Sequence, residues 1–340
     1  LNSIVHFTGA AASTTQCAND VIFGTVDRVV IDGGYNDTPV AVSVQPEGYL
    51  RYPQTNACNR NLLGTFKLNR SEIEGTNIGV ATTMRSKAQV DINFSTIDAL
   101  VSGVWIENAN QITNINKNTF IATLGDVGGH IGSVVQTVNL AEGDDPPDTS
   151  RLVLHENIFE FQVLIINQAN KKAEKLQRGG NLETSLVPTA GILIDGQGET
   201  DISSLITGNI IRLNSYLYTG ILALDLSDGH ISGNTFEVPF WDEPQWNSGL
   251  EIDAYLSGTA SGWTVSANDF DDTSVTFWDN TTGNYFGPNQ AASVNDWGDN
   301  IVIADGNTAS ESTIQKINTK PWRLHTTMIG SGSATSGSGD

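Results

Sequence analysis

Two short segments place carboxylates at spacings that suit glycosidic-bond hydrolysis. Glu251 and Asp253 lie two residues apart in Gly249-Leu-Glu-Ile-Asp253, and Asp195 ends the similar block Gly191-Ile-Leu-Ile-Asp195. On a β-strand, residues two apart share a face and lie about 7 Å from each other. Inverting glycosidases use two carboxyl groups about 6.5–9.5 Å apart, one protonating the leaving oxygen and the other activating water. We therefore predict Asp195, Glu251 and Asp253 as catalytic candidates, with a solvated acidic surface as the alternative.

Aromatic residues crowd the sequence around these acids. The segment at 236–247 (FEVPFWDEPQWN) is too long for a tight turn and is predicted to loop out beside them. Exposed Trp faces stack on sugar rings, whereas burial of these rings as a loop cap is the alternative. The predicted substrate-binding residues are Glu107, Asp225, Trp241, Trp246 and Tyr255. The other aromatic residues of this region are Phe240 and Trp263.

An internal repeat supplies the elements that position these residues. Six Gly-led apolar blocks, each followed by an Asn-containing element, recur about every 25 residues where no loop intervenes. The blocks begin at Gly79, Gly103, Gly132, Gly191, Gly220 and Gly249, and the Asn residues are Asn93, Asn118, Asn157, Asn209, Asn234 and Asn268. One coil cannot bury its apolar stripe alone, but coils stacked about 4.8 Å apart form parallel sheets around a continuous interior. The repeat thus predicts an all-β solenoid.

The repeat also assigns a role to each position. The Gly is expected to form the turn entering each strand, and the Asn side chains are expected to stack amide to amide along the turns. Offsets one and three after Gly, such as Val104 and Ile106, should point inward, and offsets two and four outward. The outward row at offset four contains Thr83, Glu107, Gln136, Asp195, Leu224 and Asp253, with Glu251 at offset two and Asp225 one place beyond the strand.

Two pieces of this repeat identify a superfamily. Ile206-Thr-Gly-Asn-Ile-Ile211 and Ile231-Ser-Gly-Asn-Thr-Phe236 resemble the coil repeat of pectate-lyase-like right-handed β-helix proteins. The resemblance covers roughly residues 64–272, with 21–34 as an earlier coil, and implies a right-handed parallel β-helix whose polysaccharide sites lie on an outward strand face. Lyases, hydrolases, epimerases, viral tailspikes and adhesins share this fold, so the resemblance implies much less about function.

Breaks in the repeat divide the chain into regions. The predicted regions are an N-terminal cap or first coils at 1–63, the parallel β-helix at 64–275, an aromatic and Asn-rich segment at 276–329, and a flexible tail at 330–340. An acidic loop at 141–150 and a basic segment at 168–188 interrupt the helix, and the pattern NKKAEKLQRGG in the second predicts a short α-helix. Inserted loops either build a binding site or are plain solvated excursions.

The charge of the chain limits its partners. Its 340 residues carry 17 Lys and Arg against 38 Asp and Glu, a net charge of −21. This balance disfavours nucleic acid and argues against a lyase for acidic polysaccharides. The absence of an apolar stretch of about 18 residues argues against membrane insertion. Because the sequence begins at Leu1 without a signal-like segment, we expect a processed or excised piece. The basic residues weighed for a lyase are Arg85, Lys87 and Arg212.

No cofactor or metal is expected. His155 and His230 lack ligand spacing and are expected to be ordinary hydrogen-bonded residues. Ca²⁺ is a minor option because neither acid-rich group matches an EF-hand loop. These groups are Asp144, Asp145 and Asp148, and Asp269, Asp271 and Asp272. Cys17 and Cys58 are either a disulfide or two buried thiols.

These features predict an extracellular protein, whether secreted, on a cell surface or on a virion, that recognises a polysaccharide or cell-surface glycan. Hydrolysis by the outward carboxylates is an added option, and a glycoside hydrolase is favoured over a lyase. The pattern is similar to that of viral tailspikes. The alternative is a structural or adhesive surface protein with a non-catalytic solenoid spacer. Open end coils expose strand edges, so a homotrimer and an end-to-end homopolymer are both options.

Overall fold

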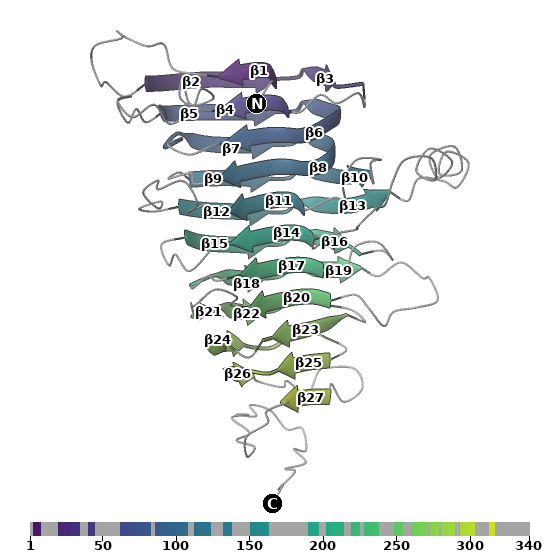
Figure 1. Ribbon diagram of the computed structural model, residues 1–340. Coiled ribbons are helices and arrows are strands. Elements are labelled where there is room, and N and C mark those ends of the chain that lie inside the picture. The colour runs from purple at the N-terminus through teal and green to yellow at the C-terminus, as the bar shows by residue number, and fades with distance from the viewer. Residues whose placement is uncertain are drawn as a thin grey trace, which may run out of the picture.

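The computed structural model shows a stack of β-coils running from the N-terminal to the C-terminal end (Figure 1). It describes residues 3–7, 20–34, 40–44, 62–82, 86–107, 112–123, 132–137, 150–162, 190–196, 202–213, 219–224, 228–237, 248–253, 260–270, 273–278, 280–289, 291, 293–302 and 313–316. Every secondary-structure element in these ranges is a strand, and the strands pair in parallel.

The strands stack into three lanes along the axis. The first lane is an 11-stranded sheet of β2 (Asp20–Asp27), β5 (Leu62–Asn69), β7 (Gln89–Asn93), β9 (Ile112–Asn116), β12 (Ser150–His155), β15 (Ile202–Thr207), β18 (His230–Ser232), β21 (Ala260–Ser261), β22 (Thr264–Ser266), β24 (Thr281–Phe286) and β26 (Asp299–Val302). The other two lanes belong to one 16-stranded sheet.

The second and third lanes share two long strands. The second lane contains β3 (Val30–Asp32), β10 (Thr119–Thr123), β13 (Ile158–Gln162), β16 (Ile210–Arg212) and β19 (Thr235–Glu237). The third lane contains β1 (Ser3–Phe7), β4 (Val40–Val44), β11 (Gly132–Thr137), β14 (Ala190–Asp195), β17 (Thr219–Leu224), β20 (Ser248–Asp253), β23 (Ser274–Phe277), β25 (Ser293–Asp296) and β27 (Thr313–Lys316). Because β6 (Glu72–Thr82) and β8 (Thr96–Glu107) run through both lanes, the two lanes form one continuous curved surface.

The interior consists of apolar rows in which equivalent residues of successive coils pair. One first-lane row is Ile92, Ile115, Leu154, Ile206, Ile231 and Val265. The matching third-lane row is Val104, Val134, Ile192, Ile221, Leu250 and Val275. All of these side chains are 0% exposed. Since full burial of such a side chain stabilises the fold by about 1.5–3 kcal/mol, these rows are a main source of its stability.

The second lane buries aromatic rings, and the Gly-led blocks leave space for them. Phe236 stacks on Phe270 with ring centroids 4.5 Å apart. A Cβ built on Gly220 would lie 2.7 Å from Cε1 of Phe236, and one on Gly249 would lie 2.7 Å from Cδ1 of Phe270. Neither glycine has a positive φ. The predicted role of these glycines in the turn is therefore wrong: they are needed because a side chain would collide with the ring.

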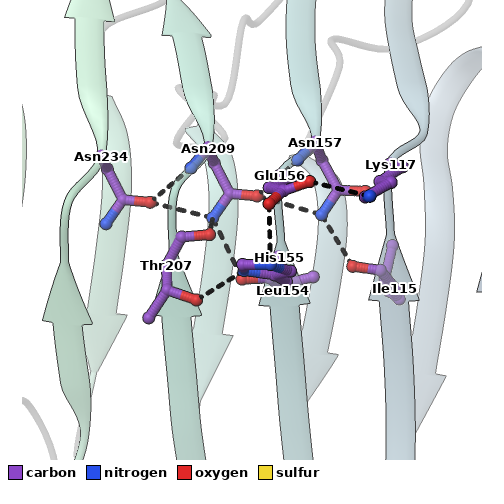
Figure 2. Close-up of polar contacts among 9 residues, drawn as sticks. All are labelled: Ile115, Lys117, Leu154, His155, Glu156, Asn157, Thr207, Asn209 and Asn234. Atoms are coloured by element: carbon purple, nitrogen blue, oxygen red, sulfur yellow. Dashed lines mark hydrogen bonds and ion pairs between the residues drawn. The ribbon is translucent and has the colours of Figure 1, made fainter.

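From Asn118 onward, one asparagine in each coil closes the corner between the first and second lanes, as Figure 2 shows for Asn157, Asn209 and Asn234. The Oδ1 of Asn209 accepts hydrogen bonds from the backbone N (2.9 Å) and the Nδ2 (3.0 Å) of Asn157. Its own Nδ2 donates to Oδ1 of Asn234 (2.9 Å) and to the backbone O of Leu154 (3.1 Å). The same pattern joins Asn118, Asn157, Asn209, Asn234, Asn268 and Asn289, here called the asparagine ladder. The predicted amide-to-amide stacking is thus confirmed.

The residue before each ladder asparagine from Asn118 to Asn268 turns the chain. Lys117, Glu156 and Ala267 adopt φ values of 57°, 52° and 56°, a left-handed conformation that is rare for residues other than glycine. On the outer side of the corner, the carboxylate of Glu156 contacts Lys117 Nζ through Oε2 (3.2 Å) and His155 Nε2 through Oε1 (3.1 Å) (Figure 2). The hydrogen bond from Lys117 is the main reason why the pKa of Glu156 is lowered. His155 Nδ1 bonds Thr207 Oγ1 at 3.0 Å, so this His is hydrogen-bonded as predicted.

The block that begins at Gly132 is displaced by one residue from its predicted register. Thr137 pairs with Glu107, so Thr137 takes the outward place predicted for Gln136. Gln136 instead points inward, is 2% exposed, and donates from Nε2 to Ser150 Oγ at 2.6 Å. The prediction for Gln136 was wrong because glycine alone does not fix the register, which follows the pairing with the strands on either side.

Asn93 also differs from its predicted role. It lies on the outer side of the corner, where its Nδ2 donates to Asn69 Oδ1 (3.2 Å) and its Oδ1 accepts from Asn116 Nδ2 (3.0 Å). The ladder position in this coil belongs to Ser95, whose backbone N donates to Asn118 Oδ1 at 2.9 Å. A short hydroxyl side chain therefore replaces the amide in the early coils.

The predicted fold class, an all-β parallel β-helix, is confirmed. Asn209 and Asn234 occupy the same position in adjacent coils and are 25 residues apart. Parallel pairing continues across the predicted boundary at 63, between β2 and β5, and across that at 275, between β23 and β25; the division into regions stays a prediction. The predicted features outside the described residues are the acidic loop at 141–149, the helix within 168–188, the tail at 330–340, and Cys17 and Cys58.

Asn209→Ala is expected to lower the free energy of unfolding by about 2–4 kcal/mol, because it leaves buried donors on Asn157 and an acceptor on Leu154 unpaired. Asn114→Ala is the matched control, since Asn114 bonds only Asp91 (2.8 Å) on the outward side of the first lane, and it should cost under about 1 kcal/mol. Urea unfolding followed by far-UV circular dichroism measures both. Equal losses would contradict the role of the ladder.

Candidate functional site

The outward face of the third lane carries two rows of residues in register. The first row is Trp105, Val135, Leu193, Leu222, Glu251, Thr276 and Asn295. The second row is Glu107, Thr137, Asp195, Leu224 and Asp253. Asp195 and Asp253 therefore lie two coils apart in one row, as predicted, with Leu224 between them. At about 4.8 Å per coil, their backbones are about 10 Å apart.

Two tryptophans follow the strands of the next two coils. The backbone N of Trp278 donates to the O of Ile252 (3.0 Å), and that of Trp297 donates to the O of Phe277 (2.8 Å). These bonds extend the third-lane pairing one residue past β23 and β25, which follow β20 along the stack (Figure 1). Trp278 and Trp297 thus continue the second row directly after Asp253.

The two indoles form a stacked pair, here called the Trp platform (Trp278 and Trp297). Their ring centroids are 6.1 Å apart with an interplanar angle of 18°, and Trp278 is 38% exposed. Glu251 borders this pair: its Oε2 accepts from Trp278 Nε1 at 3.4 Å and its Oε1 accepts from Thr219 Oγ1 at 3.0 Å. The site therefore combines an exposed aromatic surface with a carboxylate held at its edge.

The middle of the same outward face is apolar and buried. Val135, Leu193, Leu222 and Leu224 are between 1% and 8% exposed, and Trp105 packs against the cluster that contains them. The two-residue period of the strands predicts that these residues point away from the core. They do pair in the same rows as Glu251 and Asp253. Glu107 and Asp195 on this face are half-buried, as Glu251 is, and Glu251 is the carboxylate that borders the exposed Trp278.

The sequence analysis missed both residues of the Trp platform. Its aromatic candidates were taken from the region before residue 264, where the repeat is strongest. The missed signal is a short internal similarity: Ser274-Val-Thr-Phe-Trp278 and Ser293-Val-Asn-Asp-Trp297 have the same S-V-x-x-W pattern. Because the two pieces pair residue by residue, the shared spacing brings their tryptophans together.

Trp263 is not part of the exposed aromatic surface. It is 1% exposed and belongs to the core. Its ring fills the space beside Gly229, where an added Cβ would lie 1.9 Å from the ring atom Cζ3. The backbone N of Trp263 donates to Asn284 Oδ1 at 2.9 Å, in a second corner that Asn284 and Asn300 continue. Trp263, named among the aromatic residues near the predicted acids, is therefore a core residue.

The remaining predicted site residues are separated by the structure or lie outside it. Glu107 is at the N-terminal end of the second row, on β8, three coils before Leu224. Asp253 ends β20, and only its backbone position is described. The predicted substrate-binding residues outside the described part of the chain are Asp225, Trp241, Trp246 and Tyr255.

Arg212, one of the three basic residues weighed for a lyase, lies in the second lane. Its Nε donates to Glu237 Oε2 at 2.7 Å, and its Nη1 bonds Glu160 Oε1. The hydrogen bond to Glu237 is the main reason why the pKa of Arg212 is raised above its usual value. A guanidinium that is held protonated by two carboxylates cannot serve as a general base. Lys87 precedes β7 in the first lane, and Arg85 lies outside the described residues.

The described residues contain neither a metal site nor a membrane-spanning helix. Among the described residues, no group of three or more His, Cys, Asp or Glu side chains is placed to hold a metal ion. Of the two acid-rich groups considered for Ca²⁺, only Asp269 belongs to the described part. The described strands and turns include no helix long and apolar enough to cross a membrane.

The fold defines the class of this protein as a parallel β-helix solenoid. Comparisons of the chain with models of known protein families, with curated protein sequences and with solved structures gave no match.

Stacking of the platform indoles is expected to give an exciton couplet in the far-UV circular dichroism spectrum. Trp278→Phe and Trp297→Phe should each remove the couplet, because both rings are needed for it. Trp105→Phe, which changes an indole in the apolar part of the same face, should leave it in place. A couplet that persists in both platform variants would contradict the stacking.

Proposed function

We propose that this protein recognises a polysaccharide outside the cell through the Trp platform and Glu251. The observation that carries the proposal is the exposed, stacked pair of indoles with a carboxylate fixed at its edge. Flat aromatic faces stack on sugar rings and provide contact area at little entropic cost, since Trp has few rotatable bonds. Each oxygen of Glu251 accepts one protein hydrogen bond and has a further lone pair for a sugar hydroxyl.

The shape of the site favours a polymer over a free sugar. Trp278 and Trp297 occupy successive coils, so the platform extends along the solenoid axis. Within the described residues it is a surface feature of the third lane, continuous with Glu251 and the backbone of Asp253. A linear chain of sugars can lie along such a surface and contact several coils at once. The small binding free energies from the separate contacts then add up.

If the site also catalyses a reaction, that reaction is hydrolysis of a glycosidic bond by its carboxylates. The backbones of Glu251 and Asp253 are about 7 Å apart along β20, and those of Asp195 and Asp253 are about 10 Å apart across two coils. The first backbone spacing allows a carboxyl separation of about 6.5–9.5 Å, the range that inverting glycosidases use. Leu224, which lies between Asp195 and Asp253, is only 8% exposed, so Glu251 and Asp253 are the better pair. A glycoside hydrolase remains favoured over a lyase.

The coil repeat supports placing the protein among extracellular members of the pectate-lyase-like superfamily, such as viral tailspikes. This placement would also account for a net charge of −21, which keeps an exposed protein soluble. Trimer formation is part of the same proposal, by analogy with that group.

A structural or adhesive role is the second candidate, and one observation favours it. The first coil exposes apolar side chains on strands that pair on one side only: Phe23 is 85% exposed, Val30 is 64% exposed and Val21 is 55% exposed. Such an edge can add strands from another copy, which would make the solenoid a unit of an end-to-end assembly. Sedimentation at increasing protein concentration tests this role.

Trp278→Ala is expected to weaken binding to a recognised glycan by about tenfold or more, because loss of a central aromatic anchor costs over about 1.4 kcal/mol. A glycan array identifies the ligand, and calorimetry measures the change. Trp105→Ala is the control and should bind like wild type. The recognition proposal is contradicted if the wild type binds no glycan on the array.

Asp253→Asn and Glu251→Gln test the hydrolase option in a reducing-end assay on the same glycan. If the two carboxylates act as acid and base, each variant should lose about 10²-fold or more of the activity, while Asp195→Asn should keep most of it. Binding by the wild type without release of reducing ends would leave a binding protein and remove the hydrolase option.

A further inference from the structure

The charges around the Trp platform distinguish between classes of sugar. We infer that the platform selects a polysaccharide with free amino groups, such as a de-N-acetylated hexosamine polymer, over neutral or acidic ones. This inference rests on the proposed function and adds the chemical class of the ligand. Its basis is the position of Glu251 relative to the indole of Trp278, together with the composition of the two outward rows.

Glu251 is held where it can pair with a cation above the platform. Its Oε2 receives the indole N–H of Trp278 at 3.4 Å and its Oε1 receives the hydroxyl of Thr219 at 3.0 Å. These two neutral donors orient the carboxylate and leave its charge uncompensated by either of them. An ammonium group at this edge would contact the carboxylate and also the negative face of an exposed indole.

Among the described residues, the two outward rows of this face carry no positively charged side chain. From β8 to β25, the two outward rows contain four acids and, among the described residues, no Lys, Arg or His. The acids are Glu107, Asp195, Glu251 and Asp253. The Lys and Arg side chains with described ion pairs lie elsewhere: Arg28, Arg70 and Lys117 at the corner of the first lane, and Arg212 in the second lane.

The Trp platform and Glu251 together bind an ammonium group more strongly than a carboxylate alone would. A single exposed ion pair contributes little because water screens it, but an adjacent aromatic face adds a cation–π attraction that is strongest for Trp. The stacked ring of Trp297 extends this face to the next sugar. Uronate or sulfate groups would instead face Glu251 and the negative ring faces, and the net charge of −21 would repel them at longer range.

The test compares glucosamine oligomers with N-acetylglucosamine oligomers of equal length, which differ only in the charge and acetylation of the nitrogen. Calorimetry at low salt is expected to show about tenfold tighter binding of the amine form, and added salt should reduce this preference. Glu251→Gln keeps an acceptor for Thr219 and should abolish the preference, because removing the charge weakens binding of the amine form more than binding of the acetylated form. Glu107→Gln, a distant acid of the second row, should keep the preference.

The outcomes separate this inference from the proposed function. Equal or tighter binding of the acetylated form, or an amine preference that survives in Glu251→Gln, overturns the inference and leaves recognition of polysaccharide intact. Selective binding of some other neutral or acidic glycan on the array overturns it as well. Failure of the wild type to bind any glycan removes the proposed function itself, and the inference with it.

Discussion

From Asn118 to Asn268, each coil of this solenoid is fixed to the next by one buried asparagine amide whose hydrogen bonds reach both neighbouring coils. In the case of Asn209, the oxygen receives two donors from Asn157, and the nitrogen donates forward to Asn234 and back to the carbonyl of Leu154. A slip of the register by one residue would leave these buried groups unpaired and would turn the apolar rows outward. The ladder therefore fixes the register of the coils. The register in turn determines which side chains of successive coils lie next to each other.

The proposed site follows from this constraint. Trp278 and Trp297 come from different coils and meet only because β23 and β25 pair residue for residue. Glu251 comes from a third coil, and Thr219 from a fourth. Glu251 and Thr219 lie on β20 and β17, and the two tryptophans directly follow β23 and β25, so four coils supply the site. Sites built on paired strands are held more precisely than sites built on loops, since the backbone hydrogen bonds fix their spacing.

The outward face is not uniform, although the strand period alone would make it so. Its central part is an apolar cluster around Leu193 and Leu222, which are 8% and 6% exposed. In the same row, half-buried Glu251 follows Leu222. At the C-terminal coils, this carboxylate lies beside the exposed Trp278. The first coil is exposed for a different reason: its strands lack neighbours on one side, which leaves Phe23 in solvent.

Much of the fold could be predicted from the sequence. The repeat with Asn at one corner and aliphatic residues at alternating positions predicts an all-β parallel solenoid, because only stacked coils bury such stripes. It also predicts the ladder from Asn118 to Asn268 and the shared row of Asp195 and Asp253. These features depend on local period and on repetition, which one sequence contains in full.

Only the tertiary structure decided the features that depend on which residues pair. Counting from the glycine of its block placed Gln136 one residue away from its true position, because the register there follows the pairing of Thr137 with Glu107. Nothing local distinguishes the buried Trp263 from the exposed Trp278; the space beside Gly229 buries the first, and the end of β23 exposes the second. Composition and period determine a solenoid and its inward face. Contacts between coils determine which outward residues meet and remain exposed, because those contacts join residues far apart in the sequence.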